Sequence, residues 1–175
     1  MGVGGNPQSV VRVAQYGFNL MLAGLGMNLP RLRQYVDLFD RALAHFETPR
    51  PLLGLGVNAY VADTDRQARD ELWPEYEVRM NRIGAERGWS GIDRASFEDS
   101  IDHGVQLIGS VDRVVDRAIE LVRTLGLDRL SMSFDTMSLP LAQKTRSVRL
   151  LGEQVLPRVR AALATDASTA AEVRA

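Results

Sequence analysis

The sequence predicts an α/β fold built on a parallel sheet, from the order of its segments and the character of its strands. Apolar runs alternate along the chain with segments of helical period, which is the order of right-handed β-α-β units. The run FNLMLA at residues 18–23 is almost continuously apolar, as in parallel strands covered on both faces. A length of 175 residues is enough for one ordinary domain.

Turn and capping residues separate the elements in the first part of the chain. An Asn-Pro start predicts a helix over residues 6–16, and Gly17 ends it before the strand at 18–23. A second helix is expected over residues 30–46, because its apolar side chains recur at spacings of three and four. Residues 52–62 are the next strand candidate, although two glycines weaken the pattern.

The middle of the chain predicts one long helix followed by an irregular excursion. Asp-Thr-Asp at residues 63–65 is suited to cap the helix, and Pro74 is expected to kink or split it. Residues 84–100 have little periodicity, so we expect an irregular segment there, and the stretch from about residue 84 to 103 should be the least ordered internal region.

The last third predicts two more strands and two more helices. We expect a short strand at residues 105–108, a helix capped by Ser110 and closed by Gly126, a strand at 129–134, and a helix from 141 to about 162 with a break at Pro157. The final residues are small and polar. We therefore expect one domain over residues 1–163 and a disordered tail over 164–175.

Composition excludes several classes of function. The 21 basic and 22 acidic residues leave a net charge of −1, which gives no basic surface for nucleic acid or anionic lipid. The absence of cysteine excludes disulfides, thiolate metal sites and cysteine nucleophiles. His45 and His103 lie far apart in sequence and are interpreted as surface residues, so no metal site is expected.

The N-terminal region favours a cytoplasmic protein. Residues 1–15 have no charged segment before an apolar run, as a signal peptide would. The longest apolar region, residues 10–25, is interrupted by Arg12, Gln15 and Asn19 and falls short of a membrane span.

The strongest candidate binding motif is GGNPQS at residues 4–9. Its glycines let the backbone approach a ligand closely, and the helix start leaves N–H groups that favour an anion such as phosphate. Asn6 and Ser9 add side-chain donors. The alternative is a plain helix cap after a turn, and the glycines do not complete a dinucleotide-binding fingerprint.

Two further turns are weaker candidates. Residues 109–112 (GSVD) form another glycine turn into a helix, but Asp112 in the first helical turn would repel a phosphate, so a capped helix is the alternative. Residues 135–138 (DTMS) directly follow a strand, which is where a β/α barrel places its active site. Asp135 is either an acid or base there or an ordinary turn residue.

Four segments in order resemble the bacterial luciferase-like family of flavin monooxygenases. They cover the chain from residue 3 to about 160, and they are VGGNPQSVVRVAQYGFNLMLAGLG, VNAYVADTDRQARDE, LIGSVDRVVDRAIEL and LDRLSMSFDTMSLPLAQKTRSVRLLGEQVLPRVR. No one of these motifs is specific, but the four together in this order and spacing are fairly specific.

The resemblance implies the C-terminal portion of a (β/α)8 TIM barrel with an inserted strand and helix excursion. Members of the family use reduced FMN, supplied by a flavin reductase, or the deazaflavin F420 in one branch, and they oxidise a small organic substrate with oxygen. Gly5, Asn6 and Ser9 fall where the family binds the flavin phosphate. The lack of a distinctive basic cluster for the polyglutamate tail of F420 favours FMN.

The chain departs from the family in length. A complete (β/α)8 barrel needs about 250 residues, and the family's N-terminal strands, which supply much of the flavin-ring pocket, have no counterpart here. Catalytic residues are therefore left unassigned. The alternative to a truncated monooxygenase is a non-catalytic flavin-binding or structural half-barrel.

A partial barrel predicts self-association. The strand candidates at 18–23 and 129–134 carry large apolar side chains that an incomplete barrel would leave in water, at about 1.5–3 kcal/mol each. These side chains are Phe18, Leu20, Leu22, Leu130, Met132 and Phe134. We expect a homo-oligomer, of which a homodimer is the simplest closed form.

Overall fold

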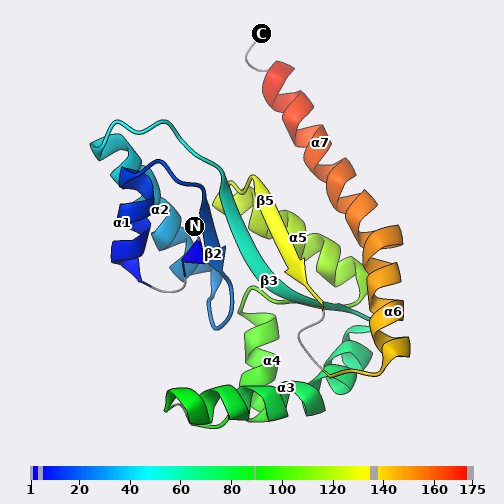
Figure 1. The fold of residues 1–175 in the computed structure, drawn as a ribbon. Helices are drawn as coiled ribbons and strands as arrows, with labels where there is room; N and C mark the ends of the chain where they lie inside the picture. The colour runs from blue at the N-terminus through cyan, green and yellow to red at the C-terminus, as the bar shows by residue number, and fades with distance from the viewer. Residues whose placement is uncertain (1, 4–5, 89, 135–137, 173–175) are drawn as a thin grey trace. The chain divides into compact units, whose positions relative to one another are not determined.

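The computed structural model describes residues 2–3, 6–88, 90–134 and 138–172, and Figure 1 shows its elements. The chain divides into two compact units, unit 1 (Met1–Ala59, Glu98–Gln106 and Leu121–Ser133) and unit 2 (Tyr60–Phe97, Leu107–Glu120 and Phe134–Ala175). The elements are β1 (Gly2–Val3), α1 (Pro7–Gln15), β2 (Leu20–Ala23), α2 (Leu29–His45), β3 (Leu53–Val61), α3 (Asp65–Arg87), α4 (Arg94–Asp102), β4 (Leu107–Gly109), α5 (Val111–Leu125), β5 (Arg129–Ser133), α6 (Leu141–Leu150), the π-helical turn η1 (Leu151–Val155) and α7 (Leu156–Glu172).

The described sheet has five strands: within unit 1, β1, β2 and β3 are parallel neighbours in that order and β5 pairs with β3, while β4 follows β3 in the sheet order. Leu20 pairs with Leu53 at the start of β2, and Asn58 pairs with Ser133 at the end of β5. Figure 1 shows β2, β3 and β5 side by side. Strands that are consecutive in space and parallel are the arrangement of a β/α barrel, as the alternating sequence predicted.

The register gives this sheet one buried face and one open face. The buried face carries Leu20, Leu22, Leu53, Leu55 and Val57, each at most 4% exposed. The open face has three rows in register, Met21–Gly54–Arg129, Ala23–Gly56–Ser131 and Asn58–Ser133, and apart from Met21 these residues are small or polar. Because successive side chains of a strand point to opposite faces, the alternation of these residue types decides which face is covered.

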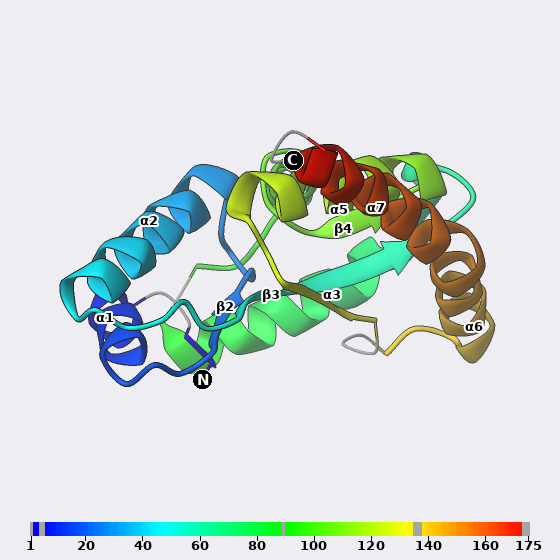
Figure 2. The same cartoon turned by 90° about the horizontal axis from the view of Figure 1, so that it is seen from above.

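Helices α1 and α2 of unit 1 begin at asparagine caps. Asn6 accepts a hydrogen bond from the N–H of Gln8 at 2.9 Å, and Asn28 accepts one from the N–H of Arg31 at 3.0 Å. These caps satisfy N–H groups that a helix start leaves without partners. The apolar stripe predicted for α2 is buried and comprises Leu32, Tyr35, Val36, Phe39, Ala42 and Leu43. Figure 2 shows α1 and α2 next to each other.

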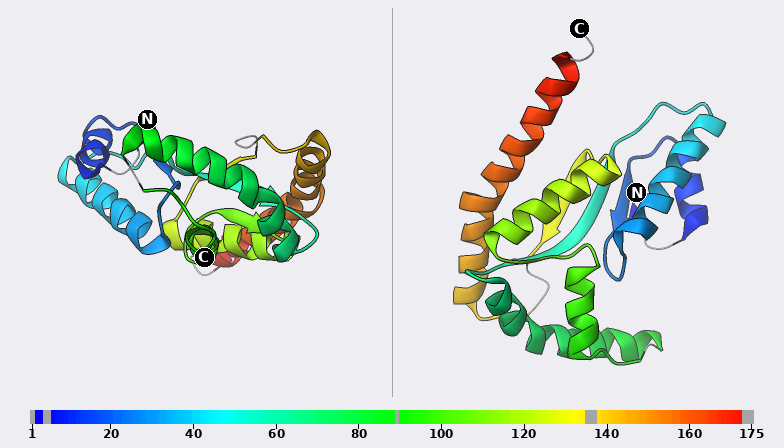
Figure 3. Two further views of the ribbon diagram at one scale, coloured as in Figure 1. Left: turned by 90° about the horizontal axis from the view of Figure 1, so that it is seen from below. Right: turned by 180° about the vertical axis from the view of Figure 1, so that it is seen from behind.

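In unit 2 the end of β3 continues beside β4, where the Ala62 N–H donates to the carbonyl of Gly109 at 3.0 Å. The break expected at Pro157 takes the form of a π-helical turn rather than an end of the helix, because α6 passes through η1 into α7 (Figure 3). A proline has no N–H for the carbonyl four residues earlier and crowds it. The wider π turn just before Pro157, in which the Leu156 N–H reaches the carbonyl of Leu151, lets the helix continue.

The irregular segment expected at residues 84–100 is in large part helical. Helix α3 extends to Arg87, and α4 covers Arg94–Asp102. The side chain of Asp93 accepts from the Ser96 N–H at 2.8 Å, and the Phe97 ring lies 4.8 Å from that of Tyr76. One cap and one buried aromatic residue therefore stabilise a helix too short to show a clear period. That this segment is less well ordered than the other internal regions stays a prediction.

Two other expectations concern helix ends. Helix α3 is a single element that contains Pro74, so the proline does not split it, and Figure 3 shows the helix bending. Helix α7 extends to Glu172, and residues 173–175 lie outside the described residues. The disordered tail expected over residues 164–175 stays a prediction. Alanine, which is frequent in this segment, has the highest helix propensity.

The apolar surface expected from a partial barrel is smaller than predicted. Leu20 and Leu22 are 1% and 2% exposed, Leu130 and Met132 are half-buried, and Phe18 and Phe134 are 51% and 44% exposed. The reason is the register, which directs the leucines of β2 to the buried face and small or polar residues to the open one. Among the described helices, none combines the length and apolar character needed to cross a membrane.

Candidate functional site

A cavity of about 330 Å³ lies in unit 1, at the carboxyl ends of β2 and β5 and over the middle of β3. Its lining includes Gly24, Gly56, Asn58, Gln106 and Ser133. In β/α barrels the loops and strand ends at this edge form the active site. The position and a volume within the lower range of small-molecule pockets make it the candidate binding site.

Two glycines shape the cavity in different ways. A Cβ on Gly24 would lie 2.9 Å from the carbonyl oxygen of Gly56 and equally close to Val57 and Val105, so a side chain does not fit there. The Gly24 N–H donates to that same carbonyl at 2.8 Å. A Cβ on Gly56 would have only the carbonyl oxygen of Leu22 nearby, at 3.7 Å. Gly56 therefore leaves space in the cavity without being required by backbone packing.

The polar groups of the cavity are neutral. Asn58 and Gln106 contribute amides and Ser133 contributes a hydroxyl, and none of the described residues lining the cavity is charged. Gln106 is 5% exposed, and its Nε2 donates to the Ser100 hydroxyl at 3.0 Å, which fixes the orientation of the amide. A small cavity with amide and hydroxyl groups suits a neutral ring that carries both hydrogen-bond donors and acceptors.

A second cavity of about 190 Å³ adjoins the first, since Gly24 and Gln106 line both. It also contains His103, whose Nδ1 lies 2.8 Å from a carboxylate oxygen of Asp99. Both side chains are largely exposed. Sequence reasoning placed His103 at the surface and missed its position beside the cavity. The spacing of four residues between Asp99 and His103, which places both side chains on one face of a helix, was the one pattern in the sequence that indicated this pair.

The residues predicted to bind a flavin phosphate lie at the start of α1. Gly5 is outside the described residues. The Gln8 N–H is taken by the Asn6 side chain, and the Ser9 N–H donates to the Asn6 carbonyl at 3.1 Å. Ser9 is half-buried, and its hydroxyl lies at the same helix start. An incoming phosphate would therefore meet the Ser9 hydroxyl rather than these two N–H groups.

The glycine turn at residues 109–112 binds a carboxylate of the chain itself. The Ser110 N–H donates to Asp65 Oδ1 at 2.7 Å, where an anion would be held at the start of α5. Burial opposes ionisation of Asp65, but the hydrogen bonds from Ser110 and the charges of Arg113 and Arg69 outweigh it and lower the pKa of Asp65. With φ of +153° at Gly109, the turn is built to pack against Asp65, which supports the interpretation as a capped helix.

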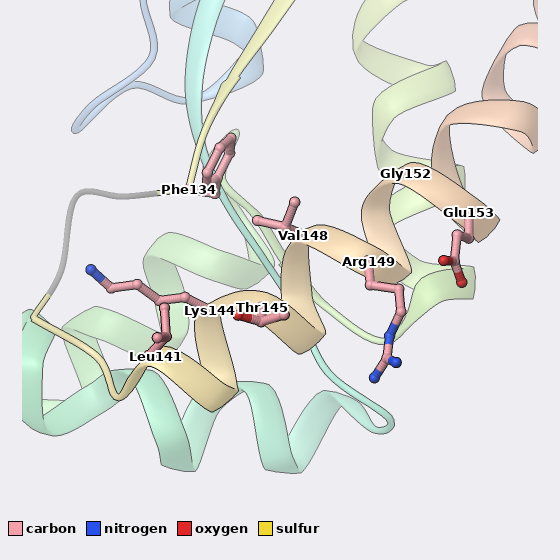
Figure 4. Close-up of a pocket in the computed structure, with 8 residues that line it drawn as sticks. All are labelled: Phe134, Leu141, Lys144, Thr145, Val148, Arg149, Gly152 and Glu153. Carbon is pink, nitrogen blue, oxygen red and sulfur yellow. The ribbon is translucent and has the colours of Figure 1, made fainter.

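The turn expected at residues 135–138 lies outside the described residues apart from Ser138. Beside it in sequence, α6 and Phe134 line an open cavity of about 610 Å³ (Figure 4). Leu141 and Val148 are 79% and 39% exposed on this side of α6, and the rim carries Lys144, Arg149 and Glu153. Its openness to solvent favours a contact surface rather than a pocket for a small molecule.

A cluster of Tyr60, Glu71 and Arg146 joins β3, α3 and α6 within unit 2. The Tyr60 hydroxyl donates to Glu71 Oε2 at 2.5 Å, Arg146 pairs with the same oxygen, and Gln67 donates to the other at 2.9 Å. Burial, with the hydrogen bond to Glu71 and its charge, raises the pKa of Tyr60. Burial opposes ionisation of Glu71, but these hydrogen bonds and the Arg146 charge lower its pKa. The fixed protonation states make this a structural cluster rather than a proton-transfer site.

Comparison with solved structures identifies the fold. The monooxygenase RslO1 from Streptomyces bottropensis is 21% identical with a TM-score of 0.71, over 89% of this chain and 47% of its own. The oxygenating constituent of 3,6-diketocamphane monooxygenase from the CAM plasmid of Pseudomonas putida, solved with FMN, is 16% identical with a TM-score of 0.65, over 90% and 48%. The F420-dependent tetrahydromethanopterin reductase from Methanopyrus kandleri is 12% identical with a TM-score of 0.60, over 90% and 50%.

These matches define the class of fold as a β/α barrel of the luciferase-like type, as the sequence predicted. This chain has the fold of part of such a barrel and spans about half the length of the structures that it matches. No family model matches the chain, and no curated protein matches it. Across the described residues, no three His, Asp or Glu side chains come together as a metal site would require.

Proposed function

We propose that this chain provides the C-terminal half of a flavin-dependent monooxygenase, in which reduced FMN and oxygen convert a small organic substrate. The observation that carries the proposal is the neutral cavity at the carboxyl ends of β2 and β5, in a fold shared with monooxygenases. A flavin ring has the donors, acceptors and flat faces that such a cavity suits. A separate flavin reductase would supply the reduced cofactor.

The residues present fit a flavin in two places. The Gly24 backbone passes so close to Gly56 that no side chain fits between them, and Asn58 and Gln106 offer amides to the edge of a ring. At the start of α1 the Ser9 hydroxyl would donate to the phosphate, with Gly5 and Asn6 beside it. Bound reduced flavin supplies the electrons for oxygen activation, while these residues bind and orient it. FMN is favoured over F420 because the sequence has no distinctive basic cluster.

The first test is flavin binding. Titration of the purified chain with FMN, followed by fluorescence quenching, should give saturable binding, with F420 binding more weakly. Ser9→Ala should weaken FMN binding roughly tenfold, because a hydrogen bond to a charged group contributes about 1.5–3 kcal/mol. Riboflavin, which lacks the phosphate, is the control ligand and should bind both variants equally. An unchanged FMN affinity in Ser9→Ala would contradict the phosphate assignment.

A non-catalytic flavin-binding half-barrel is the second candidate. The observation that favours it is the lining of the cavity, in which the described residues include no acid or base. The two candidates differ in turnover. Oxidation of an aldehyde or alkane that depends on added reduced FMN would support the monooxygenase, whereas FMN binding without such oxidation would support the second candidate.

A further inference from the structure

We propose that the second cavity of unit 1 is a substrate subsite, in which His103, oriented by Asp99, accepts a hydrogen bond from the hydroxyl group of a phenol-like ring. The inference deepens the proposed function by naming a class of substrate, and it rests on that function. Binding at the subsite can nevertheless be measured without flavin.

Two segments that are distant in sequence form the walls of this cavity. Gly24 follows β2, while Asp99 lies in α4 and His103 directly follows the last residue of that helix. An isolated antiparallel bridge between Asn28 and Gly104 joins the two segments. A Cβ on Gly104 would clash with a carbonyl oxygen in the last turn of α4, so the tight turn after His103 requires a glycine. The bridge and the turn therefore hold His103 at the cavity.

The hydrogen bond between Asp99 and His103 decides which ring nitrogen can accept a proton. Nδ1 of His103 lies 2.8 Å from Asp99 Oδ1. A carboxylate only accepts hydrogen bonds, so Nδ1 carries the hydrogen of the neutral ring and Nε2 carries the lone pair. A carboxylate that orients a histidine in this way prepares it to accept the proton of a hydroxyl group. His103 is therefore suited to a ligand that donates a hydrogen bond.

The charges around the cavity favour a neutral ligand. Among the described residues that line it, Asp99 carries the only carboxylate, and neither lysine nor arginine is present. A carboxylate or phosphate on the ligand would therefore be repelled rather than paired. A hydroxyl group is neutral and supplies the proton that Nε2 can accept.

The volume and the walls of the cavity fit one aromatic ring. The cavity measures about 190 Å³, and an apolar cavity of about 150 Å³ holds a benzene molecule. Met27 is buried and contributes apolar surface to the wall. Gly26 leaves space, because a Cβ there would have no atom within 4 Å. A single ring that carries a hydroxyl group therefore matches both the size and the polarity of the cavity.

The subsite adjoins the cavity proposed for the flavin ring. Gly24 and Gln106 line both cavities. The amide of Gln106 donates to the Ser100 hydroxyl at 3.0 Å, and Ser100 itself lines the second cavity. A ring bound beside His103 would therefore be a direct neighbour of the flavin, as a reaction between the two molecules requires.

Proton–nitrogen NMR of the purified chain, with phenol and without flavin, tests the subsite. The chain has only two histidines, so its imidazole signals come from His103 and His45, and His45→Phe assigns them. Phenol should shift the His103 signals saturably and leave those of His45, which does not line the cavity, unchanged. At about pH 8 the nitrogen shifts should place the ring proton of His103 on Nδ1.

Calorimetric titration gives the matched comparison of ligands and variants. Toluene, in which a methyl group of similar size replaces the hydroxyl, should bind about tenfold more weakly than phenol. His103→Phe keeps a ring at the exposed position but removes both nitrogens, so it should weaken phenol binding about tenfold and leave toluene binding little changed. His45→Phe is the control and should keep full phenol affinity.

Three results would each overturn the proposal: equal binding of phenol and toluene, unchanged phenol affinity in His103→Phe, or a ring proton on Nε2. Because the measurements omit flavin, they are separate from the test of the proposed function. A chain that binds phenol at His103 but not FMN would contradict the proposed function alone. A chain that binds FMN but not phenol would contradict the subsite alone.

Discussion

Replacing Arg146 by methionine should lower the free energy of unfolding by about 2–4 kcal/mol. The arginine pairs with Glu71 within unit 2, and the two side chains are only 24% and 18% exposed. Methionine would leave the Glu71 carboxylate largely buried without its cation, which costs far more than a lost surface contact. Urea denaturation followed by circular dichroism measures the change.

Arg158→Met is the matched control. Arg158 pairs with Asp112 at 2.7 Å, also within unit 2, but the two side chains are 50% and 81% exposed. Water already solvates both charges, so the loss should stay below about 1 kcal/mol. Equal losses in the two variants would show that the cluster of Tyr60, Glu71 and Arg146 has no special role in stability.

The same cluster predicts how stability depends on pH. The pKa of Glu71 is lower in the folded chain than its ordinary value, so the unfolded chain binds the proton more readily. This contribution to stability is complete above the ordinary glutamate pKa and is lost as the pH falls through the lower, folded-state pKa. Unfolding midpoints measured from neutral to acidic pH should therefore fall less steeply for Glu71→Gln than for the unsubstituted chain. Parallel profiles would contradict the assignment.

Local patterns account for the parts of the fold that the sequence predicted well. The caps at Asn6 and Asn28 act on N–H groups two or three residues away. The apolar stripe of α2 depends on spacings of three and four along one helix. Caps and helical spacings depend only on residues close together in the sequence. They can therefore be recognised without knowing which distant residues the helix packs against.

The site was less predictable because it depends on register between distant strands. Ala23, Gly56 and Ser131 form one row, although more than a hundred positions separate the first from the last. A shift of one residue in either pairing would send these side chains to the other face. Likewise, the Ser110 N–H donates to the carboxylate of Asp65. The two residues are 45 positions apart, and no local sequence motif predicts this contact.

Gly56→Val is the variant expected to affect flavin binding most. Gly56 lies on the open face of β3 and lines the cavity of about 330 Å³. A Cβ there would meet only the Leu22 carbonyl oxygen, at 3.7 Å, and a β-branched residue suits a strand. The chain should therefore fold normally, with its unfolding midpoint little changed, while the two methyl groups occupy space that the flavin ring needs.

The expected result is a roughly tenfold to hundredfold loss of FMN affinity, because overfilling a packed site costs about 1–3 kcal/mol. Ser131→Val is the control, since Ser131 lies in the same row of the open face as Gly56 but does not line the cavity. Fluorescence titration of both variants with FMN and with riboflavin separates the ring from the phosphate. Gly56→Val should weaken both ligands equally, in contrast to Ser9→Ala, which should weaken FMN alone. Full affinity in a folded Gly56→Val chain would place the flavin ring elsewhere.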